Sequence, residues 1–412
     1  MSGHLVGEIP FYHEPALGGS TGFKQGLPAP KVLISAGEAS GDLYGSYLAA
    51  ELLRRHPDIE LFGCAGTRMQ RAGVRPVVDS ASLAVAGVVE VLVHLPRIYG
   101  EYRKLVGEIR RNRPDVAVLT DSPDFHLRLA RELKRMGIPV IYFVAPQVWA
   151  WRKDRLPLMR RTIDRLLCIF PFEQDFFRQH GIGADYIGHP LTRMIQPSAP
   201  KAVLRKGYEL PVDVPLVALL PGSRSGEVRR HLPYLLQAAE ELSHAMPVRF
   251  VLALPDGFSG RTDLSTFSER FSRISIQVRE GQTWDVLACA DLALAASGTV
   301  TIEACLLKVP MIAFYRVNAL SWQIGKLLVR VPFYSMVNLM AGKQVIPELI
   351  QDDLTGSKLA QLALALLRDH TRRAQMISDL ESVANALRGP HDPIEQAASV
   401  VEGYLKKDTV HA

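Results

Sequence analysis

Near the middle of the chain, a turn rich in small residues has the composition of a phosphate-binding site. Gly222, Ser223 and Arg224 follow the apolar run Leu216 to Leu220 and precede a helical pattern that begins near Glu227. Small residues at a strand-to-helix turn expose backbone N–H groups, and the start of the helix adds partial positive charge. Arg224 would add a guanidinium fork that suits a phosphate. A plain strand–loop–helix connection with a surface arginine explains the same pattern, so the spacing alone leaves both interpretations open.

A second turn of this kind lies about 75 residues further along the chain, at Ser297, Gly298 and Thr299. Ser297 and Thr299 are good helix caps, and Gly298 permits close approach of the backbone to a ligand. Glu303 follows one helical turn later, where its carboxylate could accept both hydroxyls of a ribose whose diphosphate sits at the helix start. The alternative is that Glu303 only compensates the helix dipole. Two such turns in one half of the chain favour a nucleotide diphosphate site.

The loop from Gly37 to Asp42 is a third strand-to-helix turn, in the first half of the chain. It lacks the G-x-G-x-x-G pattern of dinucleotide-binding loops, and the charge of Glu38 disfavours a phosphate directly at this turn. A sugar or acyl headgroup is easier to place there. The alternative is a tight turn in which Ser40 or Asp42 caps the next helix.

A carboxylate also follows the apolar strand predicted at Val116 to Leu119. Asp121 would face a cleft at the carboxyl end of that strand, where it could act as a general base; capping of the next helix is the competing interpretation. Asp124 is predicted to cap the helix that begins near Phe125. The chain contains no D-x-D sequence, so a metal-bound diphosphate of the kind that this motif serves is not favoured.

Two histidines and two tryptophans lie near these loops. His126 and His189 are the nearest histidines, and a lone histidine is more often structural than catalytic. Trp149 and Trp151 stand beside Arg152 in a cationic cluster. Aromatic and basic residues together suit a membrane interface or a lipid headgroup, but core tryptophans beside a solvated helix face produce the same pattern.

Short apolar runs alternate with longer amphipathic stretches, which predicts parallel sheets covered by helices on both faces. The predicted strands are 32–35, 60–63, 116–120, 140–144 and 166–170 in the first half and 216–220, 249–253, 292–296 and 310–314 in the second. The segment 196–213 is charged and contains prolines, as is typical of a linker. We therefore expect two α/β domains with the site in the cleft between them, since open α/β sheets bind ligands beyond the carboxyl ends of their strands.

The composition is that of a soluble protein with a sizeable core. The 412 residues are 48% hydrophobic and 22% charged, which excludes a disordered or collagen-like chain. No apolar run reaches the ~18 residues of a membrane-spanning helix, and the start of the chain lacks the order of a signal peptide. The net charge of +6 is compatible with anionic substrates, lipid headgroups or nucleic acid. Widely spaced cysteines without a C-x-x-C pair favour a reducing, cytoplasmic setting.

Taken in order, the motifs closely resemble those of the lipid-A-disaccharide synthase family of bacterial glycosyltransferases. The matching segments are 36–42, 87–92, 121–125, 148–152, 171–173, 188–190, 220–224, 296–299 with Glu303, 315–317 and 338–342. The resemblance spans Lys31 to Asp353. Val337 stands where the family usually has a proline, and Gln147 replaces a common serine.

The resemblance implies a GT-B fold, an α/β architecture of two Rossmann-like domains that face each other across a cleft, with no metal and no cofactor. It implies transfer of a diacylglucosamine unit from UDP-2,3-diacylglucosamine to 2,3-diacylglucosamine 1-phosphate (lipid X), with inversion, to give the β-1,6-linked disaccharide phosphate and UDP. Both substrates carry acyl chains, so we expect a cytoplasmic protein in peripheral contact with the inner face of the membrane. A nucleic-acid partner is not expected, and a homodimer is compatible with the sequence.

The family's site residues carry over onto matching positions of this chain. Asp121 matches the proposed general base for the primary hydroxyl of the acceptor. The UDP-binding side would comprise Gly222, Ser223, Arg224, Glu227, Ser297, Gly298, Thr299, Glu303 and Asn338. The acceptor side would comprise Gly37, Glu38, Ser40, Asp124, Trp149, Arg152 and His189.

The expected domain organisation follows from the linker and the resemblance. It comprises a poorly ordered tail at 1–29, an acceptor- and lipid-binding domain at 30–195, the linker at 196–213, a UDP-sugar-binding domain at 214–390 and a C-terminal helix at 391–412, for which packing against the first domain is one option. The competing functions are another GT-B enzyme of UDP-sugars, such as a UDP-GlcNAc transferase or epimerase, and a non-catalytic protein that binds lipid or nucleotide.

Overall fold

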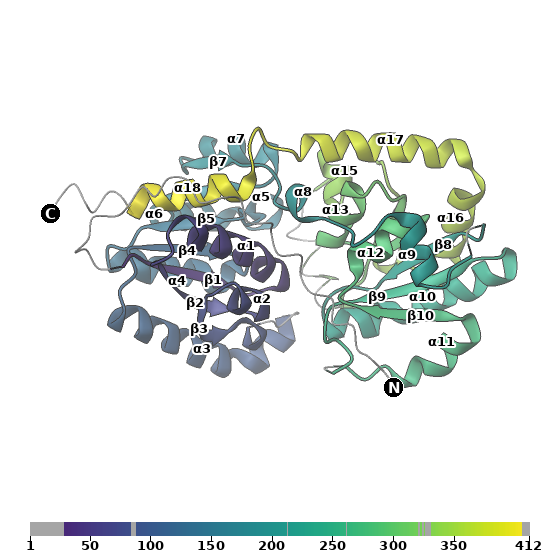
Figure 1. Ribbon diagram of the computed structural model, residues 1–412, viewed down its shortest axis with the longest axis horizontal. Helices are drawn as coiled ribbons and strands as arrows, with labels where there is room; N and C mark the ends of the chain where they lie inside the picture. The colour runs from purple at the N-terminus through teal and green to yellow at the C-terminus, as the bar shows by residue number, and fades with distance from the viewer. Residues whose placement is uncertain are drawn as a thin grey trace.

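The chain folds into two parallel β-sheets, each covered by helices, that stand side by side (Figure 1). The computed structural model describes residues 29–83, 88–211, 213–260, 262–319, 322–323, 325 and 331–405, with the backbone alone for 88–94. The predicted tail at 1–29 therefore lies outside the described residues except for its last position.

The first sheet has seven strands in the order β3-β2-β1-β4-β5-β6-β7, and every neighbouring pair is parallel. Its strands are β1 Lys31–Ala36, β2 Glu60–Ala65, β3 Arg75–Asp79, β4 Val116–Thr120, β5 Val140–Phe143, β6 Arg165–Cys168 and β7 Ala184–Tyr186. Its helices are α1 Ala39–Arg55, α2 Thr67–Arg71, α3 Val88–Arg111, α4 Pro123–Arg135, α5 Val148–Trp151, α6 Leu156–Thr162 and α7 Pro171–Gln179.

The second sheet has six parallel strands in the order β10-β9-β8-β11-β12-β13. Its strands are β8 Leu216–Leu220, β9 Arg249–Leu254, β10 Ile276–Glu280, β11 Leu292–Ala296, β12 Met311–Tyr315 and β13 Glu348–Ile350. The helices that follow are α10 Ser225–Ala245, α11 Ser268–Ile274, α12 Thr283–Cys289, α13 Thr299–Leu306, α15 Met336–Ala341, α16 Gly356–Arg368 and α17 His370–Ala386.

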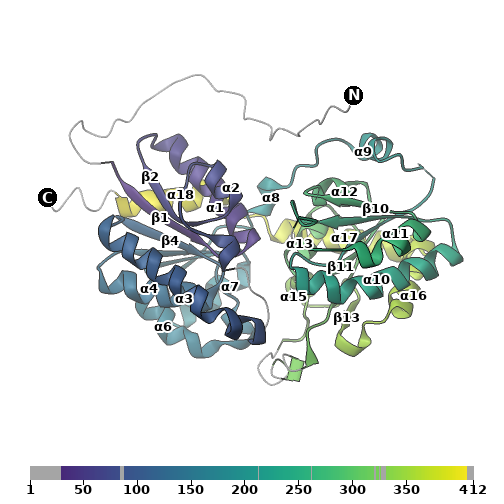
Figure 2. The same cartoon turned by 90° about the horizontal axis from the view of Figure 1, so that it is seen from below.

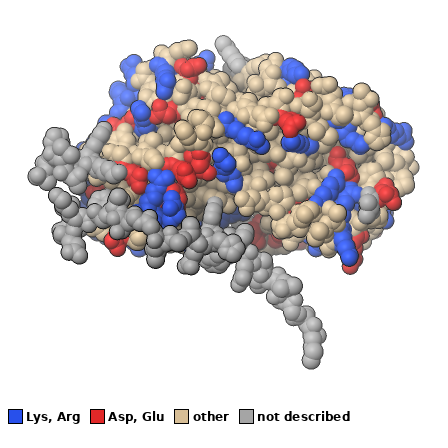
Figure 3. All heavy atoms as spheres, turned by 45° about the horizontal axis from the view of Figure 1, so that its top comes forward, with Lys and Arg blue, Asp and Glu red and all other residues tan. Residues whose placement is uncertain are grey.

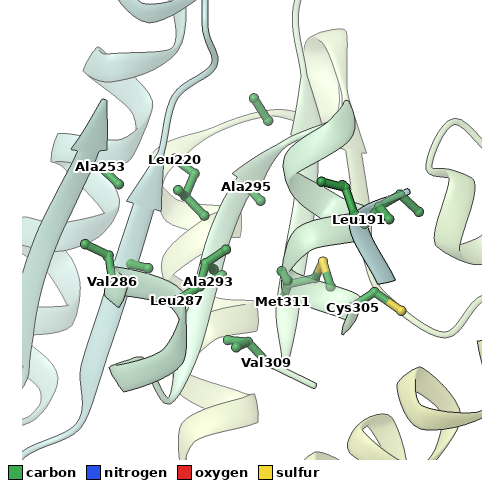
Figure 4. Packing of buried hydrophobic residues seen from close by; sticks show 14 of the residues in the cluster. Leu191, Leu220, Ala253, Val286, Leu287, Ala293, Ala295, Cys305, Val309 and Met311 are labelled. Carbon is green, nitrogen blue, oxygen red and sulfur yellow. The ribbon is translucent and has the colours of Figure 1, made fainter. Parts of the chain in front are cut away.

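The central strands were predictable because both faces of each sheet are covered. Every residue of β4, β8 and β11 is buried, as expected for a parallel strand with helices on either side. Figure 4 shows the resulting core of the second domain, where Leu220, Ala293 and Val286 come from neighbouring elements. The edge strands β3 and β10 are rich in polar and charged residues that are exposed or half-buried, which is why the apolar pattern did not reveal them.

The chain crosses between the two domains twice, and the two crossings touch. The first runs from β7 through α8 Leu191–Met194 and α9 Lys201–Gly207, so the predicted linker contains a helix. The second runs from α17 to α18 Pro393–Leu405, which packs beside α1 of the first domain through the Arg55–Glu402 ion pair of 3.2 Å (Figures 1 and 2). A Cβ at Gly188 would lie 2.5 Å from the backbone nitrogen of Gly389, so these two glycines let the crossings meet.

The surface carries both signs of charge. Figure 3 shows Lys, Arg, Asp and Glu side chains interspersed over the face that it displays. On this face the arrangement is typical of an ordinary soluble protein and differs from the basic stripe of a nucleic-acid-binding surface. Among the described residues, no helix is both long and apolar enough to cross a membrane.

Candidate active site

Both predicted halves of the site follow strands at the point where the strand order of a sheet reverses. In the first domain this point lies between β1 and β4, which lead into Gly37 and Asp121. In the second it lies between β8 and β11, which lead into Gly222 and Ser297. Ligands of open α/β sheets bind at such switch points, so the topology places the predicted residues where a ligand is expected.

Asp121 holds the first-domain turn through its carboxylate. Its Oδ1 accepts a hydrogen bond of 2.8 Å from the N–H of Gly37, and its Oδ2 accepts one of 3.0 Å from the N–H of Glu38. Burial and the carboxylate of Glu38 raise the pKa of Asp121 well above its usual value, against these backbone hydrogen bonds. A carboxylate with a raised pKa is a stronger proton acceptor, which suits a general base.

The backbone of Asp121 lies in the left-handed region, with φ at 54°, and Ser122 follows with φ at 34°. Such backbone strain is kept only where the surroundings enforce it. Here Tyr142 donates its hydroxyl to the Asp121 carbonyl at 2.5 Å, and His126 Nδ1 hydrogen-bonds the same oxygen at 3.0 Å. The His126 Nε2 pairs with Ser35 Oγ at 2.8 Å.

His126 therefore supports the Asp121 turn and stays neutral near pH 7, because burial lowers its pKa to about 4. Tyr142 was not singled out from the sequence, since it lies in an apolar strand and shows no local pattern. The structure thus assigns the two residues a shared positioning role around the Asp121 carbonyl.

We expect Gly41→Ala to lower kcat by about 10- to 100-fold, although alanine is the better helix former. Gly41 lies in the first turn of α1, and a Cβ there would lie 1.8 Å from Asp121 Oδ2. The carboxylate would have to move. The matched control is Gly45→Ala one turn later, where the Cβ would meet only the flexible end of Met69. Steady-state kinetics of both variants check this; equal turnover in the two would contradict it.

The second-domain turn is held by Glu227. Its Oε2 accepts the N–H groups of Ser223 at 3.2 Å and Arg224 at 3.4 Å, and its Oε1 accepts the Tyr315 hydroxyl at 3.0 Å. Gly222 has φ at 121°, and a Cβ there would lie 2.7 Å from Glu227 Oε2, so both backbone and space require glycine. Glu227 thus supports the turn, and its contact with a nucleotide stays a prediction.

Arg224 connects the two domains. Its Nη2 lies 2.8 Å from Glu38 Oε2 in the first domain, and its Nη1 lies 3.0 Å from Glu227 Oε1 in its own helix. Because Glu38 also donates its N–H to Asp121, a continuous chain of contacts runs from the predicted base to the predicted phosphate turn. The structure brings these predicted residues of the two domains together.

The other turn of the second domain presents three predicted residues. Ser297 donates its hydroxyl to the Tyr334 carbonyl at 3.1 Å, while Gly298 and Thr299 are exposed at the start of α13. Among the described residues, none would come within 4 Å of a Cβ at Gly298. The turn is therefore open to a ligand, but no contact within the described residues requires a glycine at position 298.

Glu303 lies half-buried on α13, one turn after Thr299. Burial raises its pKa to about 7, against a hydrogen bond from Trp284 and the positive charge of Arg68. Arg68 belongs to α2 of the first domain, so Glu303 also faces the other half of the molecule. The acceptance of ribose hydroxyls by Glu303 stays a prediction.

Sequence reasoning missed His231, which joins two loops of the second domain. Its Nδ1 pairs with the Pro221 carbonyl at 2.7 Å, and its Nε2 accepts the N–H of Arg316 at 3.1 Å. Burial lowers the pKa of His231, so the ring stays neutral near pH 7. The sequence pattern placed His231 on the apolar face of a predicted helix. An ordinary core residue has the same position, so the pattern did not indicate a contact between loops.

Asn338 lies on α15, which contacts α13, and its amide is used by its own chain. It is fully buried, and its amide nitrogen donates to the Ile346 carbonyl at 2.9 Å and to Glu348 Oε1 at 2.7 Å. Its Oδ1 accepts the N–H groups of Val345 and Ile346. These contacts use both ends of the amide, so Asn338 shapes the segment after α15.

The acceptor-side helix caps differ from the predictions. The prediction that Asp124 caps its helix is wrong, because α4 begins at Pro123 with Ser122 as the N-cap, and Asp124 pairs with Arg155 instead. Neither Ser40 nor Asp42 caps α1. Glu38 is the N-cap, and Asp42 accepts the N–H groups of Arg68 and Met69 at the start of α2. Ser40 lies half-buried in the first turn of α1.

The two tryptophans differ in environment. Trp149 is half-buried and donates its indole N–H to the buried Glu173 at 3.1 Å. Burial raises the pKa of Glu173 to about 8, against that hydrogen bond. Trp151 is exposed, and the guanidinium of Arg152 lies 5.5 Å from its ring centroid. Of the two tryptophans in the aromatic and basic cluster, Trp149 therefore packs inward and Trp151 lies at the surface.

His189 lies where the two crossings meet, and its backbone N–H donates to the Leu387 carbonyl at 2.9 Å. It is buried in edge-to-face contact with Tyr44 at 6.1 Å and Phe170 at 5.5 Å, and burial lowers its pKa to about 3. Its Nδ1 accepts the N–H of Leu191 at 3.2 Å. These contacts are those of a structural histidine. A contact between His189 and the acceptor would require the Tyr44 and Phe170 rings to move. The described residues contain no cluster of three His, Cys, Asp or Glu side chains that could hold a metal ion.

Comparison with known proteins agrees with the motifs. The family model described as lipid-A-disaccharide synthetase matches residues 32–397. The lipid-A-disaccharide synthase of Solibacter usitatus (strain Ellin6076) is 52% identical over 382 residues, which cover 93% of this chain and 99% of that protein.

Two solved structures show the same fold. S. aureus MnaA, in a co-structure with UDP, has a TM-score of 0.63 at 13% identity over 92% of this chain and 97% of its own. The glycotransferase of kitacinnamycin has a TM-score of 0.62 at 17% identity over 92% of this chain and 100% of its own. The predicted GT-B architecture of two Rossmann-like domains is thus confirmed. The chain belongs to the lipid-A-disaccharide synthase family, and it is a glycosyltransferase (hexosyltransferase) on the GT-B fold.

Proposed function

We propose that this protein transfers 2,3-diacylglucosamine from its UDP donor to the 6-hydroxyl of 2,3-diacylglucosamine 1-phosphate, with inversion at the anomeric carbon. The products are the β-1,6-linked disaccharide 1-phosphate and UDP. The observation that best supports this proposal is the chain of contacts from Asp121 through Glu38 to Arg224, because it links a carboxylate in one domain to the arginine of a strand-to-helix turn in the other.

In the proposed reaction the acceptor oxygen forms a bond to the anomeric carbon of the donor while the bond from that carbon to the β-phosphate oxygen breaks. Asp121 takes the hydroxyl proton, and the departing UDP keeps the electron pair. Negative charge therefore grows on the diphosphate. Arg224 and the N–H groups at the starts of α10 and α13 would stabilise that charge, since fixed dipoles aimed at a developing anion lower the barrier. Glu303 would hold the ribose.

The test is a product assay by mass spectrometry with UDP-2,3-diacylglucosamine and defined acylated or non-acylated glucosamine 1-phosphates. We expect UDP release and a disaccharide phosphate with the acylated acceptor only, and a β anomeric signal by NMR. Conversion of UDP-GlcNAc without a sugar acceptor would support an epimerase instead. UDP binding without turnover of any of these substrates would support the non-catalytic alternative.

We also propose peripheral contact with an anionic membrane surface through Trp151 and Arg152. Trp151 is 41% exposed, and the guanidinium of the half-buried Arg152 lies 5.5 Å from its ring centroid, whereas Arg155 is buried in an ion pair. An amphipathic ring beside cations suits the headgroup region. We expect Trp151→Ala to weaken cosedimentation with vesicles that contain phosphatidylglycerol, and higher salt to weaken it further. Unchanged cosedimentation of the variant would contradict this contact.

A further inference from the structure

Arg224 is held by two carboxylates of different character. Glu227 lies three residues further along the same helix, is 10% exposed and is fixed by the turn that it supports. Glu38 reaches Arg224 from the other domain, and its side chain is 41% exposed. The Glu227 partner is therefore part of the turn, whereas the Glu38 partner can leave by rotation of its own side chain.

The arrangement presents a conflict of charge. Two carboxylates around one guanidinium leave the turn with a net negative charge, although the proposed donor brings a diphosphate to this place. Like charges in partly buried surroundings repel. A diphosphate that binds Arg224 must therefore compete with at least one of the two carboxylates. Glu38 is the one that can be displaced, because its backbone is held without the ion pair to Arg224.

The Glu38 backbone is anchored at the base. Its N–H, with that of Gly37, donates to the Asp121 carboxylate at the start of α1. The side chain can swing away from Arg224 while these backbone hydrogen bonds persist. One residue thus touches both the proposed base and the proposed diphosphate ligand.

We propose that Glu38 is an internal counter-ion, which holds Arg224 across the cleft in the free protein and is displaced from it by the diphosphate of the donor. This inference rests on the proposed function. Release from Arg224 leaves the Glu38 charge unbalanced beside Asp121, so occupation of the donor site strengthens the base. Donor binding and proton abstraction are thereby coupled through one side chain.

The other titratable groups around Asp121 do not carry a competing charge. Burial lowers the pKa of His126 to about 4, and burial raises the pKa values of Tyr142 and Cys64 above their usual ranges. All three are therefore neutral near pH 7. Among the described groups that face Asp121, Glu38 is the one whose charge donor binding would expose.

The experiment is calorimetric titration of UDP into Glu38→Gln, with wild type and Glu269→Gln as references. Glutamine keeps a hydrogen-bond acceptor for Arg224, and Glu269 lies exposed on α11, where its change removes the same charge away from the cleft. We expect Glu38→Gln to bind UDP about 3- to 10-fold more tightly than wild type, with a difference that shrinks at high salt. We expect Glu269→Gln to match wild type.

A second readout tests the link to the base. The negative charge of Glu38 raises the pKa of Asp121, so its removal should lower that pKa. The base acts when deprotonated, and the acid limb of the kcat/KM profile should therefore move to lower pH in Glu38→Gln. An unmoved limb would overturn the coupling to the base.

Unchanged or weaker UDP binding by Glu38→Gln would overturn the counter-ion role, because Glu38 would then be neutral toward the diphosphate or would orient Arg224 for it. This failure is distinct from failure of the proposed function. A wild-type protein that binds no UDP, or that turns over no acylated acceptor, contradicts the function itself. A wild type that does both, with no gain in Glu38→Gln, contradicts the counter-ion alone.

Discussion

Asp121→Asn should give a folded protein that binds UDP like wild type and turns over about 10²- to 10⁴-fold more slowly, the range that a positioned general base supplies. Asparagine has nearly the same shape but cannot take the proton of the acceptor hydroxyl. The proposed donor site is in the other domain, so the affinity for UDP should not fall. Steady-state kinetics and calorimetry on the same preparation check the two parts.

The substitution also disturbs the fold, and a control must separate the two effects. The carboxylate of Asp121 accepts the N–H groups of Gly37 and Glu38, and an amide can accept only one of them through its oxygen. We expect a loss of about 1–3 kcal/mol in the free energy of unfolding.

Asp42→Asn is the matched control, because Asp42 is also buried and accepts two backbone N–H groups, from Arg68 and Met69. It should lose similar stability and keep most of its turnover. Asp121→Asn with more than a tenth of wild-type turnover, or Asp42→Asn with an equal loss, would remove Asp121 from the role of base.

The positions of the turns could be predicted from the sequence, because they depend on local patterns. An all-buried strand such as β8 is a short apolar run, and the small residues that end it mark the strand-to-helix turn. In a parallel sheet the carboxyl ends of the strands lie at one edge, which explains why the turns after β1 and β4 meet through Asp121 and Gly37.

The partners of the polar side chains could not be predicted, because they lie far away in the sequence. Arg224 and Glu38 are separated by 186 positions, and the same spacing information is compatible with an exposed arginine. The family resemblance assigned Asn338 to the nucleotide side, and it did not show that the segment at 345–348 hydrogen-bonds both ends of the amide. Whether a polar group faces a ligand or its own chain depends on tertiary packing.

His189 shows the same limit for a histidine at a domain junction. Its place before the linker correctly located it between the domains, but the sequence did not show that Tyr44 and Phe170 enclose the ring. Burial without a charged partner makes the neutral form the stable one. The distinction between a reactive and a structural histidine therefore required the packing of three separate elements.

Arg224→Ala should lower kcat/KM by about 10²- to 10³-fold and weaken UDP binding. The variant lacks the guanidinium that we propose to contact the diphosphate, both in the bound donor and while negative charge develops on it. Arg229→Ala is the control, since it removes the same charge from an exposed position of the same helix. Arg224→Lys should recover only part of the affinity, because an ammonium cannot present two parallel N–H donors. Equal UDP affinity of Arg224→Ala and Arg229→Ala would exclude the contact.

The loss of UDP affinity in Arg224→Ala should exceed the contribution of the proposed contact between Arg224 and the diphosphate. Without the guanidinium, Glu38 and Glu227 both face the incoming diphosphate with no cation between them. Addition of Glu38→Gln should therefore restore part of the UDP affinity in the Arg224→Ala background, because it removes one of the two carboxylates that face the diphosphate. Calorimetry on the four proteins of this double-mutant cycle measures the coupling. A Glu38→Gln change that weakens binding further would show that the two carboxylates do not oppose the donor.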